Sequence, residues 1–164
     1  MEAGMTTSRI QVNISGFFTT HHRFLSEGGE LGQLTLAATR RGGVFRSFDG
    51  RELVLRQKSL WRSEHELHEG GLVLASARPR GFFRTAILIE FGGQTYTLAR
   101  ISFWKRGWRL LDPGNVAVME IQPQGLFKRG AFLDILGEID ANLLVFAYYL
   151  IYMRWQEEAA AAAS

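Results

Sequence analysis

The 164-residue chain has no cysteine, which excludes disulfide bonds, zinc–thiolate sites and thiol-based catalysis. Residues 1–8 also lack the basic segment and the apolar core of a secretory signal. Lysine is scarce, since three lysines accompany sixteen arginines, and the net charge is only +3. That charge is too small to require nucleic acid as a partner. The absence of cysteine and of a secretory signal predicts a protein of a reducing compartment, and we expect a cytoplasmic protein.

A hydrophobic run long enough to cross a bilayer is missing as well. The longest strongly apolar segment, residues 143–153, would span roughly 17 Å as a helix. A transmembrane helix needs about 20 apolar residues. The segment is apolar around its whole circumference, which is typical of a helix surrounded by protein. We therefore predict a buried helix and no transmembrane segment.

The remaining composition is that of a folded protein, with 46% hydrophobic and 21% charged residues. We predict one domain at residues 9–157, between a flexible leader at 1–8 and an alanine-rich tail at 158–164. Apolar side chains alternate with polar ones at 10–14, residues 34–39 follow a similar period-2 pattern, and Thr85, Ile87, Ile89 and Phe91 share one face of a further strand. About ten to twelve such short strands at close spacing indicate a mainly β sandwich or barrel.

Turn residues separate these strands. Asp49-Gly50 predicts a two-residue hairpin, and Pro113 favours a further turn at 112–115. Glycine pairs at 70–71 and 92–93 indicate two more. The segments 45–55 and 108–118 share the order aromatic-Arg strand, Asp-Gly turn and apolar strand. This similarity is either chance or the sign of a duplicated half-barrel.

The helix is predicted at about 140–156. Asp140 is a plausible N-cap, and the charges of Glu138 at the start and Arg154 near the end would suit the helix dipole. Tyr148 and Tyr149, like Tyr152, would need hydrogen-bond partners for their hydroxyls if buried.

At this point the sequence resembles the tubby C-terminal-like group, in particular the LURP-one-related proteins and the phospholipid scramblase family. The resemblance covers roughly residues 10–157 and is carried by the turn at 48–51, the segment at 108–112 and the segment at 135–140 that leads into 143–153. It implies a closed antiparallel barrel of about twelve strands around a central hydrophobic C-terminal helix. Tubby proteins bind phosphoinositide headgroups through basic residues on the barrel, whereas many bacterial members have no agreed biochemical activity.

Motifs for catalysis are absent from the sequence: it contains no nucleophile elbow, P-loop or GxGxxG pattern. His65 and His68 lack the i, i+4 spacing of a zinc helix, and on a strand they would face opposite sides. With three glutamates beside them, they indicate a solvated loop or edge strand. We therefore expect no enzyme activity, no catalytic residues, no metal site and no cofactor.

Clusters of basic residues are the main functional candidates. Guanidinium groups match phosphate geometry, and tryptophan suits a headgroup layer. The alternative is that these are solvated arginines on the barrel exterior, with the tryptophans packed inward. Arg78 and Arg80 are the nearest match to the two-apart basic pair of tubby proteins, although Pro79 between them departs from a regular strand. The predicted anion or headgroup ligands are Arg78, Arg80, Arg84, Lys105, Arg106 and Arg109, and Lys128-Arg129 forms a similar pair.

Three functions remain open from the sequence. The first is a non-catalytic binding module for anionic phospholipid, at the periphery of a membrane, or for another phosphorylated ligand. The second is a protein-interaction or scaffolding domain that uses the segments 104–108 and 64–69. The third is a phospholipid scramblase, which would need membrane insertion and which the short apolar segment disfavours.

Overall fold

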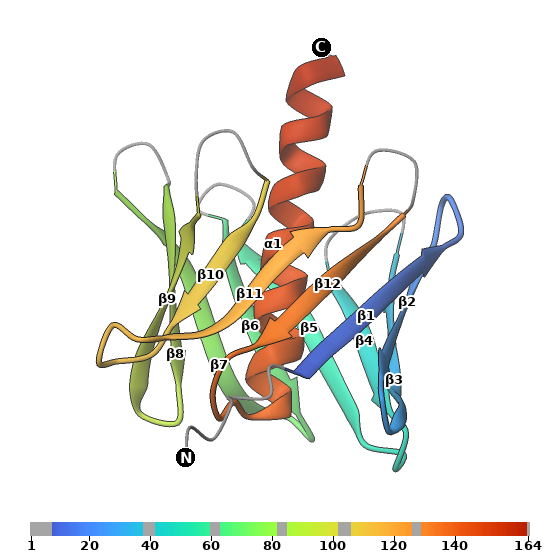
Figure 1. Cartoon of the computed structure of the whole chain (residues 1–164), viewed down its shortest axis with the longest axis horizontal. Coiled ribbons are helices and arrows are strands. Elements are labelled where there is room, and N and C mark those ends of the chain that lie inside the picture. Colours follow the sequence, from blue (N-terminus) through green and yellow to red (C-terminus); the bar gives the residue numbers. More distant parts are fainter. Residues whose placement is uncertain are drawn as a thin grey trace, which may run out of the picture.

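The fold is a closed antiparallel barrel around one central helix, as Figure 1 shows. The computed structural model describes residues 8–37, 42–59, 63–81, 85–101, 106–125 and 129–163. Each strand pairs with its neighbours in sequence, and β1 closes the barrel on β12. The strands are β1 (Ser8–Ser15), β2 (Thr20–Ser26), β3 (Gly29–Leu36), β4 (Gly42–Ser47), β5 (Glu52–Ser59), β6 (Glu64–Glu69), β7 (Leu72–Arg80), β8 (Ala86–Phe91), β9 (Gln94–Arg100), β10 (Trp108–Leu111), β11 (Ala117–Pro123) and β12 (Gly130–Ile135). The predicted mainly β barrel with a C-terminal helix is confirmed, and Ser8, which we assigned to the leader, belongs to β1.

The barrel has two ends, which are named here by where the central helix enters and leaves the barrel. At the helix-entry end, the strands are joined by short connections and α1 (Ala141–Ala163) begins after β12. At the helix-exit end, the last turns of α1 extend beyond the strands (Figure 1). Period-2 alternation places apolar side chains inside, such as Ile10 and Val12 of β1 and Ile87 and Ile89 of β8. Closure leaves no strand edge for another chain to pair with.

Turn chemistry at the helix-entry end agrees with most of the sequence predictions. The pairs Gly70-Gly71 and Gly92-Gly93 each have positive φ at both residues, as type I′ hairpins require. The turn at 112–115 is present, with Asn115 donating its N–H to the Asp112 carbonyl at 2.9 Å. The two-residue hairpin predicted at Asp49-Gly50 is wrong. β4 ends at Ser47 and β5 begins at Glu52, so four residues, 48–51, connect the strands, and the Ser47 N–H donates to the Arg51 carbonyl at 2.9 Å.

Both segments with a shared pattern are hairpins, β4–β5 and β10–β11. That the two hairpins come from a duplicated half-barrel stays a prediction.

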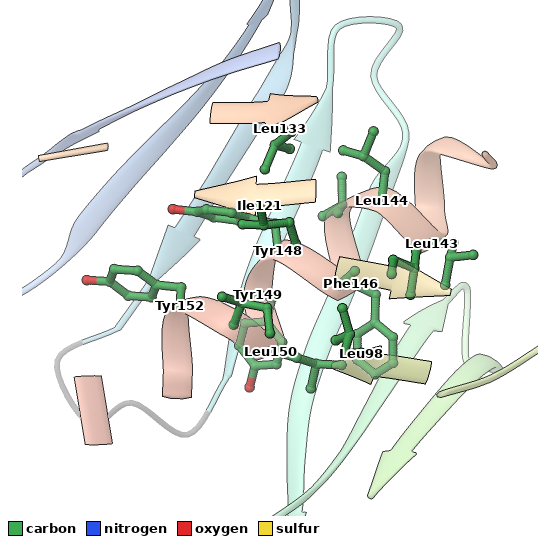
Figure 2. Packing of buried hydrophobic residues seen from close by; sticks show 14 of the residues in the cluster. Leu98, Ile121, Leu133, Leu143, Leu144, Phe146, Tyr148, Tyr149, Leu150 and Tyr152 are labelled. Carbon is green, nitrogen blue, oxygen red and sulfur yellow. The ribbon is translucent and has the colours of Figure 1, made fainter. Parts of the chain in front are cut away.

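The helix α1 fills the barrel. Nearly every side chain from Leu143 to Met153 is buried, and Figure 2 shows several of them packed against Leu98, Ile121 and Leu133 of the wall. Asp140 is the N-cap, because its carboxylate accepts the Asn142 N–H at 2.8 Å. Within the part of the chain that the structure describes, no helix is long and apolar enough to cross a membrane.

The dipole interpretation of Arg154 is wrong, because α1 continues to Ala163 and its last turn holds no basic residue. Arg154 lies within the helix and pairs with Glu157 at 3.6 Å.

Gly32 occupies an inward position of β3 where the wall is crowded. A Cβ there would lie 2.5 Å from both the Phe45 ring and the Arg46 carbonyl oxygen. We expect Gly32→Ala to lower the free energy of unfolding by about 1–3 kcal/mol through overpacking. Urea unfolding would measure the change. Gly28→Ala is the control, because Gly28 has ordinary φ and open space around it, and this substitution should cost much less.

Candidate functional site at the helix-exit end

Charge is distributed very unevenly between the two ends of the barrel. The connections at the helix-entry end carry Glu27, Asp49, Arg51, Asp112, Glu138 and Asp140. In sequence, the connections at the helix-exit end contain no acidic residue, and their basic residues are Arg40, Arg41, Arg62, Arg84, Lys105, Arg106, Lys128 and Arg129. Most of these eight lie outside the described residues, but Arg106 and Arg129 are within them. In sequence, the connections are therefore basic at the helix-exit end and acidic at the helix-entry end, while α1 brings Glu157 and Glu158 to the helix-exit end.

Aromatic residues follow the same distribution. The connections at the helix-exit end contain eight aromatic residues in sequence, whereas those at the helix-entry end contain only Phe48. Phe17 and Phe18 are described, and they form the tip of the β1–β2 hairpin. They are 92% and 86% exposed, which is unusual for two adjacent large apolar side chains.

Arg129 holds this aromatic tip in place. Its Nη1 donates to the Gly16 carbonyl at 2.6 Å, and its guanidinium carbon lies 5.7 Å from the centroid of the Phe17 ring. A guanidinium has five N–H donors, and this hydrogen bond uses only one of them. The remaining donors of Arg129 can therefore bind an anion beside the aromatic tip.

Arg106 supplies the second cation. Its guanidinium lies over the ring of Trp155 in α1, 5.7 Å from the centroid, and its carbonyl accepts the Trp155 indole N–H at 2.8 Å. Arg100 pairs with Glu158 and so also ties the end of α1 to the wall. The C-terminal part of α1 thus holds Arg106 in place and is itself fixed to the barrel wall.

A cavity of 560 Å³ joins these groups. It lies between the β1–β2 tip and the end of α1, and it includes the aromatic ring of Tyr152 and the amide of Gln156. Among the described residues that line it, Arg106 and Arg129 are charged and none is acidic. We name this surface, formed by Phe17, Phe18, Arg106, Arg129 and Trp155, the exit-end site.

Below the cavity, a buried hydrogen-bond chain connects the wall to α1. The Tyr148 hydroxyl lies 2.6 Å from His22 Nδ1, and the Thr20 hydroxyl lies 2.9 Å from His22 Nε2. A neutral imidazole has one donor and one acceptor nitrogen, so it satisfies both hydroxyls. Burial lowers the pKa of His22 to about 3, and the positive charge of Arg129 contributes to the shift.

A second pair links the opposite part of the wall to the helix. His65 Nδ1 lies 2.9 Å from the Tyr149 hydroxyl, and Figure 2 shows Tyr149 pointing in a different direction from Tyr148 and Tyr152. Burial lowers the pKa of His65 to about 4, with a further contribution from Arg154. The prediction of a solvated loop or edge strand around His65 is therefore wrong. β6 is a strand of the barrel wall, paired with β5 and β7, and His65 faces the lumen. Among the described residues, no cluster of acidic or histidine side chains could hold a metal ion.

The predicted ligands are dispersed rather than gathered. Arg78 and Arg80 are exposed on β7, and the cavity beside Arg78 is lined by Glu64, Glu66 and Glu90. Those carboxylates disfavour an anion there.

The remaining predicted ligands lie elsewhere. Arg109 pairs with Glu120 at 2.9 Å, while Arg84 and Lys105 lie outside the described residues. Of the four predicted ligands that the structure describes, Arg106 belongs to the exit-end site. Trp108 is fully buried in the barrel, so it cannot serve as an interfacial tryptophan or a protein-contact residue.

Sequence reasoning missed Phe17, Phe18 and Trp155. The signal for the first two was present, because two adjacent aromatic residues after Gly16 break the alternation of β1. Trp155 carried no such signal, since its role depends on how far α1 extends past the wall.

The fold and the site define a class: a helix-filled antiparallel barrel with a basic and aromatic end. Comparison with protein-family models, with curated proteins and with solved structures found no match to this chain. The resemblance to the tubby-like group stays a prediction.

Proposed function

We propose that this protein is a non-catalytic module that binds the surface of a membrane containing anionic phospholipid through the exit-end site. The observation that carries the proposal is the cavity in which Arg106 and Arg129 lie next to two exposed phenylalanines without an acidic neighbour. Arginine binds phosphate oxygens, and exposed aromatic side chains insert at the level of the headgroups. The arginines therefore suit the phosphate groups of a membrane surface, and the phenylalanines suit the adjacent headgroup layer.

The charges of the connections support the same orientation. An anionic leaflet attracts basic residues by about 1 kcal/mol each near its surface. The acidic connections at the helix-entry end would be repelled, so the barrel would approach with its helix-exit end, and Glu157 and Glu158 of α1 would be turned away from the leaflet. Peripheral binding of this kind needs no membrane-spanning helix.

Vesicle co-sedimentation tests the proposal. The wild-type protein should bind phosphatidylcholine vesicles that contain phosphatidylserine, and its affinity should fall as salt is raised. Replacing Arg106 and Arg129 by Gln should weaken binding roughly tenfold to thirtyfold, at about 1 kcal/mol for each charge. Phe17→Ser with Phe18→Ser should weaken it by at least tenfold, because apolar area is no longer buried.

The matched control is Leu72→Ser with Val73→Ser, a pair of exposed apolar residues at the helix-entry end. This variant should bind like the wild type. Equal binding by the control and the Phe17/Phe18 variant would contradict the proposal. Failure of the wild-type protein to bind any anionic vesicle would also contradict it and would favour a protein-interaction domain instead.

A further inference from the structure

A second cavity lies at the opposite end of the barrel, far from the exit-end site. Its volume is 360 Å³, within the range of small-molecule sites. It is bounded by residues of β2 and β3, by the β4–β5 turn and by the first turn of α1, which Figure 1 places at the helix-entry end. Sequence patterns gave no indication of it, because its walls come from segments about 100 residues apart.

The floor of this cavity is the apolar core itself. Phe24 and Phe45 contribute their rings, which pack edge to face at 5.5 Å, and Leu53 extends the same wall. Leu144 and Val145 of α1 complete it. These five side chains are all buried and form a closed apolar floor, while the exposed lining residues Leu31 and Phe48 present apolar surface to solvent. An alkyl chain placed there would leave water and contact aromatic and aliphatic surfaces on several sides.

The mouth of the cavity carries two carboxylates, Glu30 and Asp49. Glu30 accepts hydrogen bonds of 3.3 and 3.2 Å from the Arg23 guanidinium, so the negative charge offered to a ligand comes from Asp49. The only cation among the described lining residues, Arg51, is already held by Glu69 through two hydrogen bonds of 2.9 and 2.8 Å. The Asp49 carboxylate accepts hydrogen bonds from the Ser47 hydroxyl and the Arg51 N–H, and these lower its pKa, so it stays ionised. An anionic headgroup would be repelled from this mouth.

An aromatic ring completes the mouth. Phe48 lines the cavity and is 84% exposed, although it lies on a tight hairpin loop where a polar residue would be expected. An aromatic face beside carboxylates is the arrangement that attracts ammonium groups, through cation–π attraction and charge together. Phe48 therefore has the position of a headgroup contact.

We propose that the helix-entry cavity binds a cationic amphiphile, with its alkyl chain over the apolar floor beside Leu31 and its ammonium group between Phe48 and Asp49. Charge complementarity selects this ligand class over a fatty acid, whose carboxylate would meet the Asp49 carboxylate. The inference goes beyond the proposed membrane function and does not depend on it, because the two sites are at opposite ends of the barrel.

Isothermal titration calorimetry with three decyl probes tests the inference. Decyltrimethylammonium, decyl maltoside and decyl sulfate share one alkyl chain, and each is used below its critical micelle concentration. The cationic probe should bind with one-to-one stoichiometry and at least tenfold more tightly than decyl sulfate. Equal binding of all three probes, or no saturable binding of the cationic one, would overturn the proposal.

Variants of the full chain locate the site. Asp49→Asn and Phe48→Ala should each weaken the cationic probe several-fold, and Ala141→Leu should weaken all three probes because it fills the mouth. Val116→Ser is the matched control, since Val116 is an exposed apolar residue at the same end that does not line the cavity. Thermal unfolding confirms that each variant is folded. Unchanged affinity in folded Asp49→Asn and Ala141→Leu would refute the site, whatever the result of the vesicle experiment.

Discussion

Acidification from pH 7 to pH 5 should destabilise the folded protein by about 4 kcal/mol, because two buried imidazoles resist protonation until the barrel unfolds. In the unfolded chain, histidine takes up a proton below its ordinary pKa of about 6.5. In the folded chain, His22 and His65 do so only near pH 3 and pH 4. Their contribution to stability is complete above pH 6.5 and is lost as the pH falls toward those folded-state values.

Urea unfolding at a series of pH values measures this effect. The free energy of unfolding should fall by up to about 2.7 kcal/mol per pH unit between pH 6 and pH 4.5, which corresponds to two protons taken up on unfolding. His22→Gln should reduce the slope by about half, although it is less stable at pH 7. His65→Gln removes the other buried imidazole and should also reduce the slope by about half. A wild-type slope in His22→Gln would refute the assignment.

Replacing Phe146 by Asp should abolish the folded state. Phe146 is fully buried on the helix that fills the lumen, and it stacks on Tyr149 at 6.4 Å between centroids. Loss of the ring costs about 3–5 kcal/mol, and an unpaired buried charge costs several more. The sum is comparable with the whole stability of a domain, about 5–15 kcal/mol.

The measurement is soluble yield followed by far-ultraviolet circular dichroism. Ala160→Asp is the matched control, because it places the same charge on the exposed part of the same helix. It should fold with a loss of less than about 1 kcal/mol. A cooperatively folded Phe146→Asp protein would show that the helix is not the core of the barrel.

The architecture could be predicted from local sequence patterns. Alternation in β1 and β8, glycine pairs at the type I′ turns and the all-round apolar segment each depend on residues close in sequence. Together with the resemblance to the tubby-like group, they led to a closed barrel with a central helix. The Asp49-Gly50 turn was predicted too short, because hairpin length depends on where strand pairing stops.

The sites were harder to predict from the sequence, because their residues come close together only in the closed barrel. His65 lies among glutamates and reads as exposed, yet it faces the lumen because Tyr149, 84 residues later, supplies a hydroxyl there. Arg109 reads as a free cation, but Glu120 on the next strand neutralises it. Arg106 and Arg129 lie on different connections and become neighbours of one cavity only when all twelve strands have paired.

The order of elements along the chain has a consequence for biosynthesis. During translation, all twelve strands leave the ribosome before α1, and the first strand must wait for the last one to close the wall. Until residues 141–155 emerge, the apolar inner faces have no core to cover. Stable folding is therefore expected only after the helix has been synthesised, and a ribosome-bound chain ending at Asp140 should be digested by protease at a concentration that leaves the released protein intact.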